Sequence, residues 1–373
     1  MPGTAMSLAL NGAAEILGDY RQLAEDMPRA WGEACARGRI RHRPDDFRVQ
    51  EIPVCRPDGA GEHLWLRVRK TGQNTDWAAR RLAGYAGVAP REVSYAGLKD
   101  RHAVTEQWFS IRLPGLASPD WLRFDAAGIE VLEAQRHSRK LRRGALQGNA
   151  FQLRVRELEG DRAEIDLRLR RIGAQGLPNY FGPQRFGRDA GNLAHAEALF
   201  AGRLRRVAKA RRGLYLSAAR SLLFNRVLAE RVRQAHWGGA IGGDVLQLDG
   251  RSACFCVDAP DDVVRQRLAR LEVHPTGPLW GRGSTLAAGA CRELEETCLI
   301  PFVGLRNGLE AAGMKPERRA LRVRAQALAW RWPEPGVLEL GFQLPAGAYA
   351  TALLRELGEF TSDRACPEDA AHD

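Results

Sequence analysis

Strand-like alternation at both ends of the chain, with a different pattern between them, is the feature that most restricts the fold. Apolar and polar residues alternate with period two in short segments before residue 156 and again after residue 320. The predicted strands are 47–51, 63–69, 92–96, 106–113, 129–133, 151–155, 321–329 and 337–344. One early helix is expected over 74–86 and a closing helix over 349–360. Short connections favour a largely antiparallel sheet over repeated βαβ units.

The middle of the chain, residues 175–323, predicts more helix and more irregular loop. Ser217 fits the N-cap of a helix that continues to residue 235, and residues 261–271 predict a second helix. Prolines and glycines between 275 and 283 predict a loop. Because 373 residues exceed one ordinary core, we predict two domains. Residues 1–174 and 324–373 fold together, residues 175–323 are inserted between them, and the fold class is α+β.

An uneven excess of basic residues predicts an acidic partner. The formal charge is +11 and the isoelectric point is near 9.7. Residues 134–156 contain seven cations and no acid, and residues 198–229 contain six cations before residue 213 and again no acid. Phosphate backbones are the common partner of such stretches, so we predict nucleic-acid binding. A membrane surface fits less well, because neither stretch has the apolar face of an interfacial helix.

The cysteines and the chain start favour a cytoplasmic protein. The seven cysteines are scattered and form no CxxC pair, so the sequence supports neither a zinc cage nor a disulfide framework. No apolar run is long enough to cross a membrane, and no basic residue precedes the short apolar stretch at 6–10 as in a secretory signal.

The segment 94–108 is the strongest candidate for chemistry. It predicts a strand, a polar loop with Asp100 between Lys99 and Arg101, and a second strand. Two strands make a rigid mount for a loop, and adjacent cations favour the ionised carboxylate that a nucleophile or a base needs. A surface turn in which Asp100 pairs with a neighbour explains the same residues. One detail favours chemistry: the chain has only five lysines, and one of them stands beside this aspartate.

Several short motifs in order along the chain point to one protein family. The longest motif, which contains Asp100, is Gly97-Leu-Lys-Asp-Arg-His-Ala-Val-Thr-Glu-Gln107. The others are Pro44-Asp-Asp-Phe47, Gly148-Asn-Ala-Phe151, Pro178-Asn-Tyr-Phe-Gly-Pro-Gln-Arg-Phe-Gly187, Ser217-Ala-Ala-Arg-Ser-Leu-Leu-Phe-Asn225, and Leu344-Pro-Ala-Gly-Ala-Tyr-Ala-Thr351 followed by Leu354-Arg-Glu-Leu357. Together they resemble the TruD family of tRNA pseudouridine(13) synthases, over about residues 39–359.

The resemblance implies a fold and a reaction. The fold is a pseudouridine-synthase-type catalytic domain with a mostly antiparallel mixed sheet, split by an inserted α+β TRUD domain. The reaction converts uridine 13 in the D-arm of tRNA to pseudouridine, so the implied partner is tRNA. It moves the bond of the ribose C1′ from N1 to C5 of the same base. Because no electrons are gained and no group is donated, we expect no cofactor and no metal. A monomer is the default expectation for the oligomeric state.

The resemblance also implies which residues contact the substrate. Asp100 aligns with the catalytic aspartate, and Phe47, Asn149 and Tyr349 align with contacts to the target uridine. Phe47, Phe151 and Tyr349 are candidate stacking surfaces for a flipped-out base, although core packing explains each ring too. The Asn149 amide matches the polar edge of uracil, although Gly-Asn is also a turn signal. Tyr349 departs from the phenylalanine of the family, so the partner of its hydroxyl is open.

Two points about the chemistry stay open at this level. Asp100 serves equally well as a nucleophile toward the sugar, as a nucleophile toward the base, or as a base that removes a sugar proton. Lys99, Arg101 and Arg185 are candidates for pairing with Asp100 or with phosphate, and their order is undecided.

Two other functions use the same features. A non-catalytic RNA-binding protein or RNA chaperone needs only the basic surface. An RNA hydrolase would combine Asp100 with His102. Residues 1–38 carry no functional prediction.

Overall fold

The structure is a computed structural model that describes residues 20–115 and 118–362. The apolar stretch at 6–10 and the part of the predicted domain segment 324–373 beyond residue 362 lie outside the described residues. The chain divides into two compact units. Unit 2 contains Ala34–Asp166, Ala325–Gly347 and the residues from Leu357 onward. Unit 1 contains the described residues before Ala34, Leu167–Arg324 and Ala348–Glu356.

Unit 2 is built on a mixed sheet that has ten strands among the described residues. Seven of them follow the order β14-β15-β7-β2-β5-β3-β6, while β1 pairs with β7 and β16, and β4 pairs with β5. The pairs β1–β16 and β2–β5 are parallel and the rest are antiparallel, so the predicted α+β class with a mostly antiparallel mixed sheet is confirmed. The strands are β1 (Ala36–Ile40), β2 (Phe47–Pro53), β3 (His63–Thr71), β4 (Val93–Tyr95), β5 (Val104–Arg112), β6 (Ile129–His137), β7 (Leu146–Gly160), β14 (Gln326–Glu334), β15 (Val337–Pro345) and β16 (Gly358–Ser362).

One helix covers part of this sheet. α3 (Thr75–Tyr85) buries Ala78, Ala79, Leu82 and Ala83, which belong to one core cluster with apolar residues of β3, β4 and β5. This is the face on which Leu66 of β3 lies opposite Phe109 of β5. Short 3-10 helices lie at Pro44–Asp46, Pro90–Glu92 and Trp121–Arg123.

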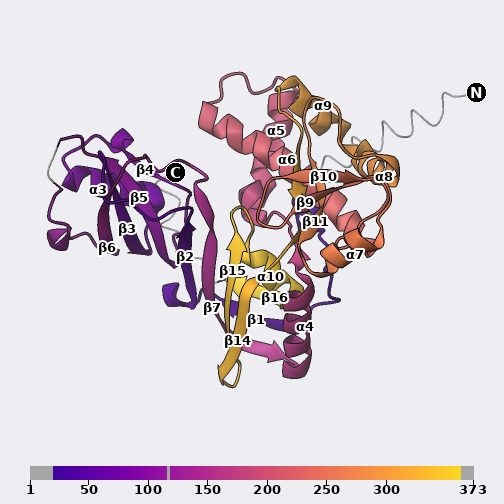
Figure 1. Ribbon diagram of the computed structural model, residues 1–373, viewed down its shortest axis with the longest axis horizontal. Helices are drawn as coiled ribbons and strands as arrows, with labels where there is room; N and C mark the ends of the chain where they lie inside the picture. The colour runs from indigo at the N-terminus through magenta and orange to yellow at the C-terminus, as the bar shows by residue number, and fades with distance from the viewer. Residues whose placement is uncertain (1–19, 116–117, 363–373) are drawn as a thin grey trace, which may run out of the picture. The chain divides into compact units, whose positions relative to one another are not determined.

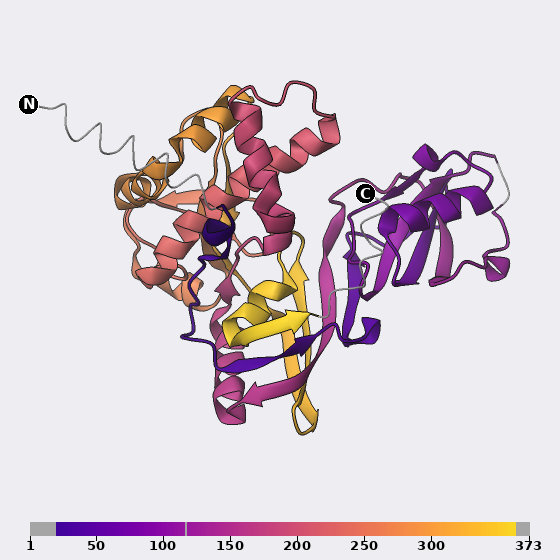
Figure 2. The same ribbon diagram turned by 180° about the vertical axis from the view of Figure 1, so that it is seen from behind.

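Strands from the two ends of the chain meet in this sheet. In Figure 1 the yellow β15 lies beside the magenta β7, and Figure 2 shows the yellow β16 next to the indigo β1. The closing helix α10 (Ala350–Leu357) therefore ends earlier than predicted, and β16 replaces its last turn. The physical reason lies at Gly358, where a Cβ atom would stand 2.0 Å from the carbonyl oxygen of Ala36. Only glycine permits this close approach of β16 to β1.

Unit 1 is mainly helical around a smaller sheet. Its four-stranded sheet has the order β10-β9-β11-β12, and β13 pairs with β8. Its strands are β8 (Leu177–Pro178), β9 (Asp244–Leu248), β10 (Cys254–Val257), β11 (Val273–Leu279), β12 (Glu317–Ala320) and β13 (Arg322–Val323). Its helices are α2 (Tyr20–Glu25), α5 (Gly191–Phe200), α6 (Lys209–Arg233), α7 (Asp262–Ala269), α8 (Gly289–Leu299), α9 (Val303–Ala311) and α10; α4 (Arg162–Gln175) leads into the unit from Asp166. Short 3-10 helices lie at Pro183–Phe186, Arg188–Ala190 and Ile300–Phe302.

The long helix α6 is the centre of the unit 1 core. Its residues Leu222, Leu223, Phe224 and Leu228 are completely buried. The predicted start at Ser217 is wrong, because the helix begins eight residues earlier, at Lys209. Its first turn contains basic residues and no side-chain cap, so the usual signal for a helix start is missing there. None of the helices in the described ranges is long and apolar enough to cross a membrane.

The predicted loop over 275–283 is also partly wrong, because β11 is a strand. β11 pairs with β9 through Val273–Pro275 and with β12 through Thr276–Leu279. Each half of β11 therefore pairs with only one neighbouring strand, as an edge strand does. Edge strands tolerate proline because one side of the backbone needs no partner.

Candidate active site

The loop that carries Asp100 is held between two paired strands. Residues 96–103, which we call the Asp100 loop, connect β4 to β5, and Tyr95 of β4 lies opposite Phe109 of β5. The side chain of Asp100 is 48% exposed, so its carboxylate is accessible from solvent. The loop therefore combines fixed ends with a reachable carboxylate.

The first internal support of the loop is Lys70 of β3. Its side chain is fully buried, and its ammonium donates to the backbone carbonyls of Lys99 (3.3 Å), Asp100 (2.9 Å) and Gln73 (2.8 Å). An ammonium has three N–H donors, so these three bonds use all of them. Burial lowers the pKa of Lys70 to about 8, an effect that the nearby Asp100 charge opposes. Lys70 thus fixes the backbone at Asp100 by charge-assisted bonds.

The second support is a chain of neutral hydrogen bonds. The Lys99 backbone N–H donates to Thr75 Oγ1 (3.1 Å), and the Thr75 hydroxyl donates to Gln107 Oε1 (3.0 Å). The Gln107 amide then donates to the carbonyl of Gly97 (3.2 Å). Thr75 and Gln107 are buried, so water does not compete for these bonds. The loop is tied in this way to the start of α3 and to β5.

The third support is an ion pair between Lys99 and Glu51 of β2. Lys99 Nζ lies 2.7 Å from Glu51 Oε2, and the two side chains are only 7% and 1% exposed. Glu51 also accepts a bond from the Trp108 backbone N–H. Sequence analysis left open whether Lys99 pairs with Asp100 or with phosphate, and its ammonium instead lies against Glu51. This contact gives Lys99 a positioning role, and its contact with substrate stays a prediction.

Asp100 forms its ion pair with Arg41, a residue that sequence analysis missed. Arg41 Nη2 lies 2.6 Å from Asp100 Oδ2, and the Arg41 guanidinium lies 4.1 Å from the centre of the Phe47 ring. Arg41 also has a left-handed backbone, with φ of 57°, which is uncommon for a residue with a side chain. The available signal was its place just before the 44–47 motif, but an arginine among 56 basic residues does not stand out.

The other predicted residues of unit 2 are brought together by strand register. Glu51 of β2 lies opposite Asn149 of β7, and Val49 lies opposite Phe151. Phe47 and Phe151 contact each other edge to face, with ring centres 6.4 Å apart. The sheet therefore places Phe47, Asn149 and Phe151 on the face that holds Glu51, next to the Asp100 loop.

The burial of these side chains shows which of them pack in the core and which stay partly accessible. Phe47 is 2% exposed, and Phe151 is 7% exposed and stacks on Phe342. Both rings therefore pack in the core beneath the site. Asn149 is half-buried, and its Oδ1 atom has no hydrogen-bond partner among the residues that the structure describes. A buried acceptor without a donor costs free energy, so Asn149 is the residue here that most needs an external donor.

Tyr349, the remaining predicted contact, belongs to unit 1. Its hydroxyl accepts bonds from Arg185 Nε (3.2 Å) and Arg185 Nη2 (2.7 Å), and Arg185 also donates to Ser217 (3.2 Å). The ring of Tyr349 lies edge-on to Phe181, 6.2 Å between centres. The hydroxyl that distinguishes this tyrosine from the family's phenylalanine is thus bound by Arg185, a residue that sequence analysis considered for Asp100 or phosphate.

A basic loop adjoins the Asp100 loop within unit 2. In residues 138–145, which we call the basic loop, the side chains of Arg139, Lys140, Arg142 and Arg143 are exposed. The Gly144 N–H donates to the Ala96 carbonyl (2.7 Å), which fixes the basic loop to the first residue of the Asp100 loop. Four exposed cations on a loop that is fixed to the Asp100 loop suit a phosphate-rich ligand.

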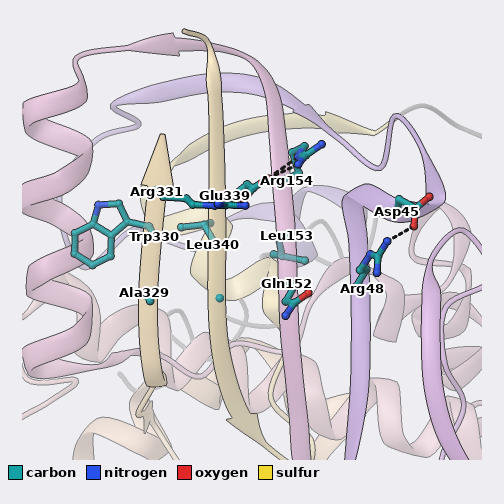
Figure 3. A pocket seen from close by; sticks show the side chains of 11 residues that line it. Asp45, Arg48, Gln152, Leu153, Arg154, Ala329, Trp330, Arg331, Glu339 and Leu340 are labelled. Carbon is teal, nitrogen blue, oxygen red and sulfur yellow. Dashed lines mark hydrogen bonds and ion pairs between the residues drawn. The ribbon is translucent and has the colours of Figure 1, made fainter. Parts of the chain in front are cut away.

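A groove of about 500 Å³ lies on the opposite face of the same sheet (Figure 3). Arg48, Gln152 and Arg154 line it, and they alternate along β2 and β7 with the residues of the Asp100 face. Its charges are paired internally: Glu339 binds both Arg154 and Arg331, and Arg48 lies 2.6 Å from Asp45. The hydrogen bond from Arg154 is the main reason that the pKa of Glu339 is lowered. The charged residues that line this groove are therefore all paired with one another.

Within residues 20–115 and 118–362, no three His, Cys, Asp or Glu side chains gather as a metal site. Among the cysteines that the structure describes, Cys55, Cys254 and Cys256 are exposed. Cys291 is buried, and burial raises the pKa of its thiol.

Comparison with known proteins gives one consistent family. The chain matches the family described as tRNA pseudouridine synthase D (TruD) over residues 29–195 and 190–357. It is 50% identical over 336 residues to the tRNA pseudouridine synthase D of Methylococcus capsulatus, covering 90% of this chain and 95% of that protein. It is 49% identical over 348 residues to the protein of the same name from Xanthomonas axonopodis pv. citri, covering 89% and 94%.

A solved structure has the same fold. The crystal structure titled as the putative tRNA pseudouridine synthase D of Methanosarcina mazei matches with a TM-score of 0.68 and 22% identity, covering 91% of this chain and 97% of that one. The identity of the bacterial relatives and the nearly complete family match lead to one conclusion: the chain belongs to the tRNA pseudouridine synthase D (TruD) family.

Proposed function

We propose that this protein converts uridine 13 in the D-arm of tRNA to pseudouridine, with Asp100 as the essential carboxylate. The observation that carries the proposal is the support of the Asp100 loop. Lys70 binds the carbonyl of Asp100 itself, while the carboxylate stays accessible and paired with Arg41. A fixed backbone with a reachable anionic side chain is what a positioned nucleophile or base requires.

The chemistry needs a single carboxylate. The bond from ribose C1′ to N1 breaks, a bond from C1′ to C5 forms, the C5 proton leaves and N1 gains a proton. Asp100 can attack the sugar, attack the base or remove a sugar proton, and each route uses the same oxygen atoms. In every case the carboxylate starts from its short ion pair with Arg41.

The uracil must stay bound while it is detached from the sugar and turns. We assign its polar edge to Asn149, because the N3–H of uracil would supply the donor that Asn149 Oδ1 lacks among the described residues. Tyr349 of unit 1, whose hydroxyl accepts bonds from Arg185, is kept as a proposed aromatic contact to the base on the family resemblance alone. Phe47 supports the site through its contact with Arg41, with Phe151 packed behind it.

Lys99 completes the proposed set as a positioning residue through Glu51 rather than as a free cation. The basic loop supplies phosphate contacts next to Asp100. We place the reaction in the cytoplasm, with the protein acting as a monomer on tRNA.

The test is the modification of two tRNA transcripts that differ at one base. One transcript carries uridine at position 13, and the matched control carries cytidine there. After incubation with the protein, pseudouridine is mapped by carbodiimide labelling and primer extension. We expect a stop at position 13 in the first transcript and no new stop in the second.

The other outcomes separate the alternatives. Binding of both transcripts without any pseudouridine would support the RNA-binding or chaperone function. Shortened RNA would support a hydrolase that uses Asp100 with His102. Pseudouridine at another position would keep the reaction but overturn the assignment to uridine 13.

A further inference from the structure

We propose that the basic patch on unit 1 at the α5–α6 connection and the first turn of α6 binds the phosphate backbone of tRNA, in addition to the contacts proposed for the Asp100 loop and the basic loop of unit 2. The patch, which we call the α5–α6 patch, consists of Arg203, Arg205, Arg206, Lys209, Arg211 and Arg212. This inference rests on the proposed function and adds to it a further contact with the same substrate.

The patch is exposed and rigid at the same time. All six side chains are exposed, whereas Leu204 and Val207 between them pack against the unit 1 core. The N–H groups of Arg203 and Leu204 both donate to the carbonyl of Ala198, which fixes the connection to the end of α5. The apolar anchors therefore turn the arginines outward. The α5–α6 connection also stands at the rim of unit 1 in both views (Figures 1 and 2).

The charges of the patch are not balanced by the residues that the structure describes. Arg203 has Glu197 at 3.6 Å. The side chains of the five other cations form no hydrogen bond and no ion pair with any residue in the described part of the chain, and residues 198–229 contain no acid. Several exposed arginines elsewhere in unit 1, such as Arg265 beside Asp262, have an acidic neighbour. Unbalanced like charges held side by side repel each other, so an anionic ligand stabilises them.

The start of α6 adds to this imbalance. Lys209, Arg211 and Arg212 stand in its first turn, which has no acidic residue and no side-chain cap. The free N–H groups of a first turn carry partial positive charge, and proteins usually place acids there. The sequence thus places cations where the helix itself disfavours them, which serves binding rather than stability.

The composition of the patch favours contacts with the phosphate backbone of the RNA over contacts with its bases. Residues 201–214 contain no aromatic side chain on which a base could stack, and no Asn or Gln to read base edges. Leu214 is the one large apolar residue in this segment that is exposed, so the patch lacks the apolar face of a membrane-binding helix. Guanidinium groups on a fixed loop fit successive phosphates of a polynucleotide.

The first experiment compares two variants that lose the same charge. The patch variant is Arg205→Gln, Arg206→Gln, Arg211→Gln and Arg212→Gln. The control variant is Arg170→Gln, Arg171→Gln, Arg251→Gln and Arg282→Gln, all exposed arginines of the same unit. Affinity for an unmodified tRNA transcript is measured by fluorescence anisotropy between 50 and 300 mM NaCl. Circular dichroism melting checks that both variants are folded.

We expect the patch variant to bind at least tenfold more weakly than the control at the lowest salt. The slope of log affinity against log salt should fall by about 3, because four phosphate contacts at about 0.7–0.9 each are lost. At saturating tRNA the turnover should stay close to that of the control. Equal affinities and slopes for the two variants would overturn the proposal, as would weaker binding to vesicles of phosphatidylcholine and phosphatidylglycerol (7:3) with unchanged binding to tRNA.

A second experiment uses the unchanged protein. Lys209 lies in the patch, and Lys315 is an exposed lysine of unit 1 outside it. Acetylation of lysines with and without tRNA is quantified by mass spectrometry. We expect tRNA to slow the labelling of Lys209 several-fold and to leave Lys315 unchanged; equal labelling of Lys209 in both states would contradict the proposal. Both readouts report binding, so a protein that binds through the patch but forms no pseudouridine would overturn the proposed function alone.

Discussion

At the scale of single residues, the candidate site depends on which group each nearby cation contacts. Three cations surround the Asp100 loop, and each makes a different contact. Arg41 pairs with the carboxylate, Lys70 binds the backbone, and Lys99 ties the loop to Glu51. The motif alone suggested that the neighbours in sequence would pair with Asp100. The ion pair of Asp100 that the structure shows comes from Arg41, which lies 59 positions earlier in the sequence.

Lys70 leads to a prediction about pH at this scale. Its ammonium has three donors for three carbonyls, and the neutral amine has only two. Since the pKa of Lys70 is lowered to about 8, activity should fall as the pH rises through 8. Lys70→Met should lower the turnover roughly 10- to 100-fold through a displaced loop, and its profile should lack this alkaline limb. The profile of tritium release against pH checks both points.

The stability of the same protein should change in the opposite direction. The pKa of Lys70 in the folded protein, about 8, lies below its ordinary value of 10.5, so the unfolded chain binds more protons between these values. Because of Lys70, the free energy of unfolding therefore increases as the pH rises from 8 to 10.5. Urea unfolding of the wild type and Lys70→Met across this window measures the difference. A constant difference between them would show that Lys70 is not buried as a charged group.

At the scale of secondary-structure elements, sequence patterns located most of unit 2. Alternation predicted β2, β3, β5 and β7 near their observed positions; β2 and β7 bury mainly one face, whereas β3 and β5 are buried over most of both faces. The patterns failed where tertiary contacts decide. The helix α6 starts in a basic, uncapped turn, and β11 keeps its strand conformation despite two prolines because β9 and β12 each pair with part of it.

The helix α10 leads to a second prediction. Its residue Glu356 is 1% exposed, and its Oε2 atom accepts bonds from the backbone N–H groups of Ala30 and Trp31. Burial raises the pKa of Glu356 to about 7, against 4.5 ordinarily. Between these values the folded protein binds a proton that the unfolded chain has lost, so stability falls as the pH rises from 4.5 to 7.

Glu356→Gln keeps the acceptor for both N–H groups and removes the charge. The free energy of unfolding of this variant minus that of the wild type should increase by about 1–3 kcal/mol from pH 5 to pH 8. Glu293→Gln, an exposed position of the same unit, is the control and should follow the wild type. Denaturant unfolding at the two pH values measures the change. If Glu356→Gln and Glu293→Gln respond alike, Glu356 does not ionise in the folded state as described.

At the scale of the whole molecule, the sequence indicated that strands near both ends share a sheet, while the exact grouping of segments was not predictable. Strands near both termini share one sheet, as the returning alternation suggested. The described residues before Ala34 and the segment Ala348–Glu356 belong to unit 1, although the sequence predicted residues 1–174 and 324–373 as one domain. The assignment of the catalytic and the inserted domain stays a prediction.

In the candidate site, too, local sequence motifs were informative, whereas contacts between segments far apart in the sequence could not be predicted. The motif around Asp100 identified the candidate loop, and register in the sheet placed Phe47, Asn149 and Phe151 near it. Arg41 and Lys70 could not be found in this way, because each reaches the loop across the sheet from a strand end without a distinctive local pattern.

The central claim is that the carboxylate of Asp100 is essential for the isomerisation. Asp100→Asn keeps the size of the side chain, and Asp45→Asn, an exposed ion-paired position of the same unit, is the matched control. Each protein in excess is mixed with tRNA labelled with tritium at C5 of uracil, and the release of tritium is followed in a single turnover. The account predicts release by Asp45→Asn at the wild-type rate, and by Asp100→Asn about 1,000-fold or more slowly, with tRNA affinity within several-fold. Release by Asp100→Asn within tenfold of the wild-type rate would contradict it.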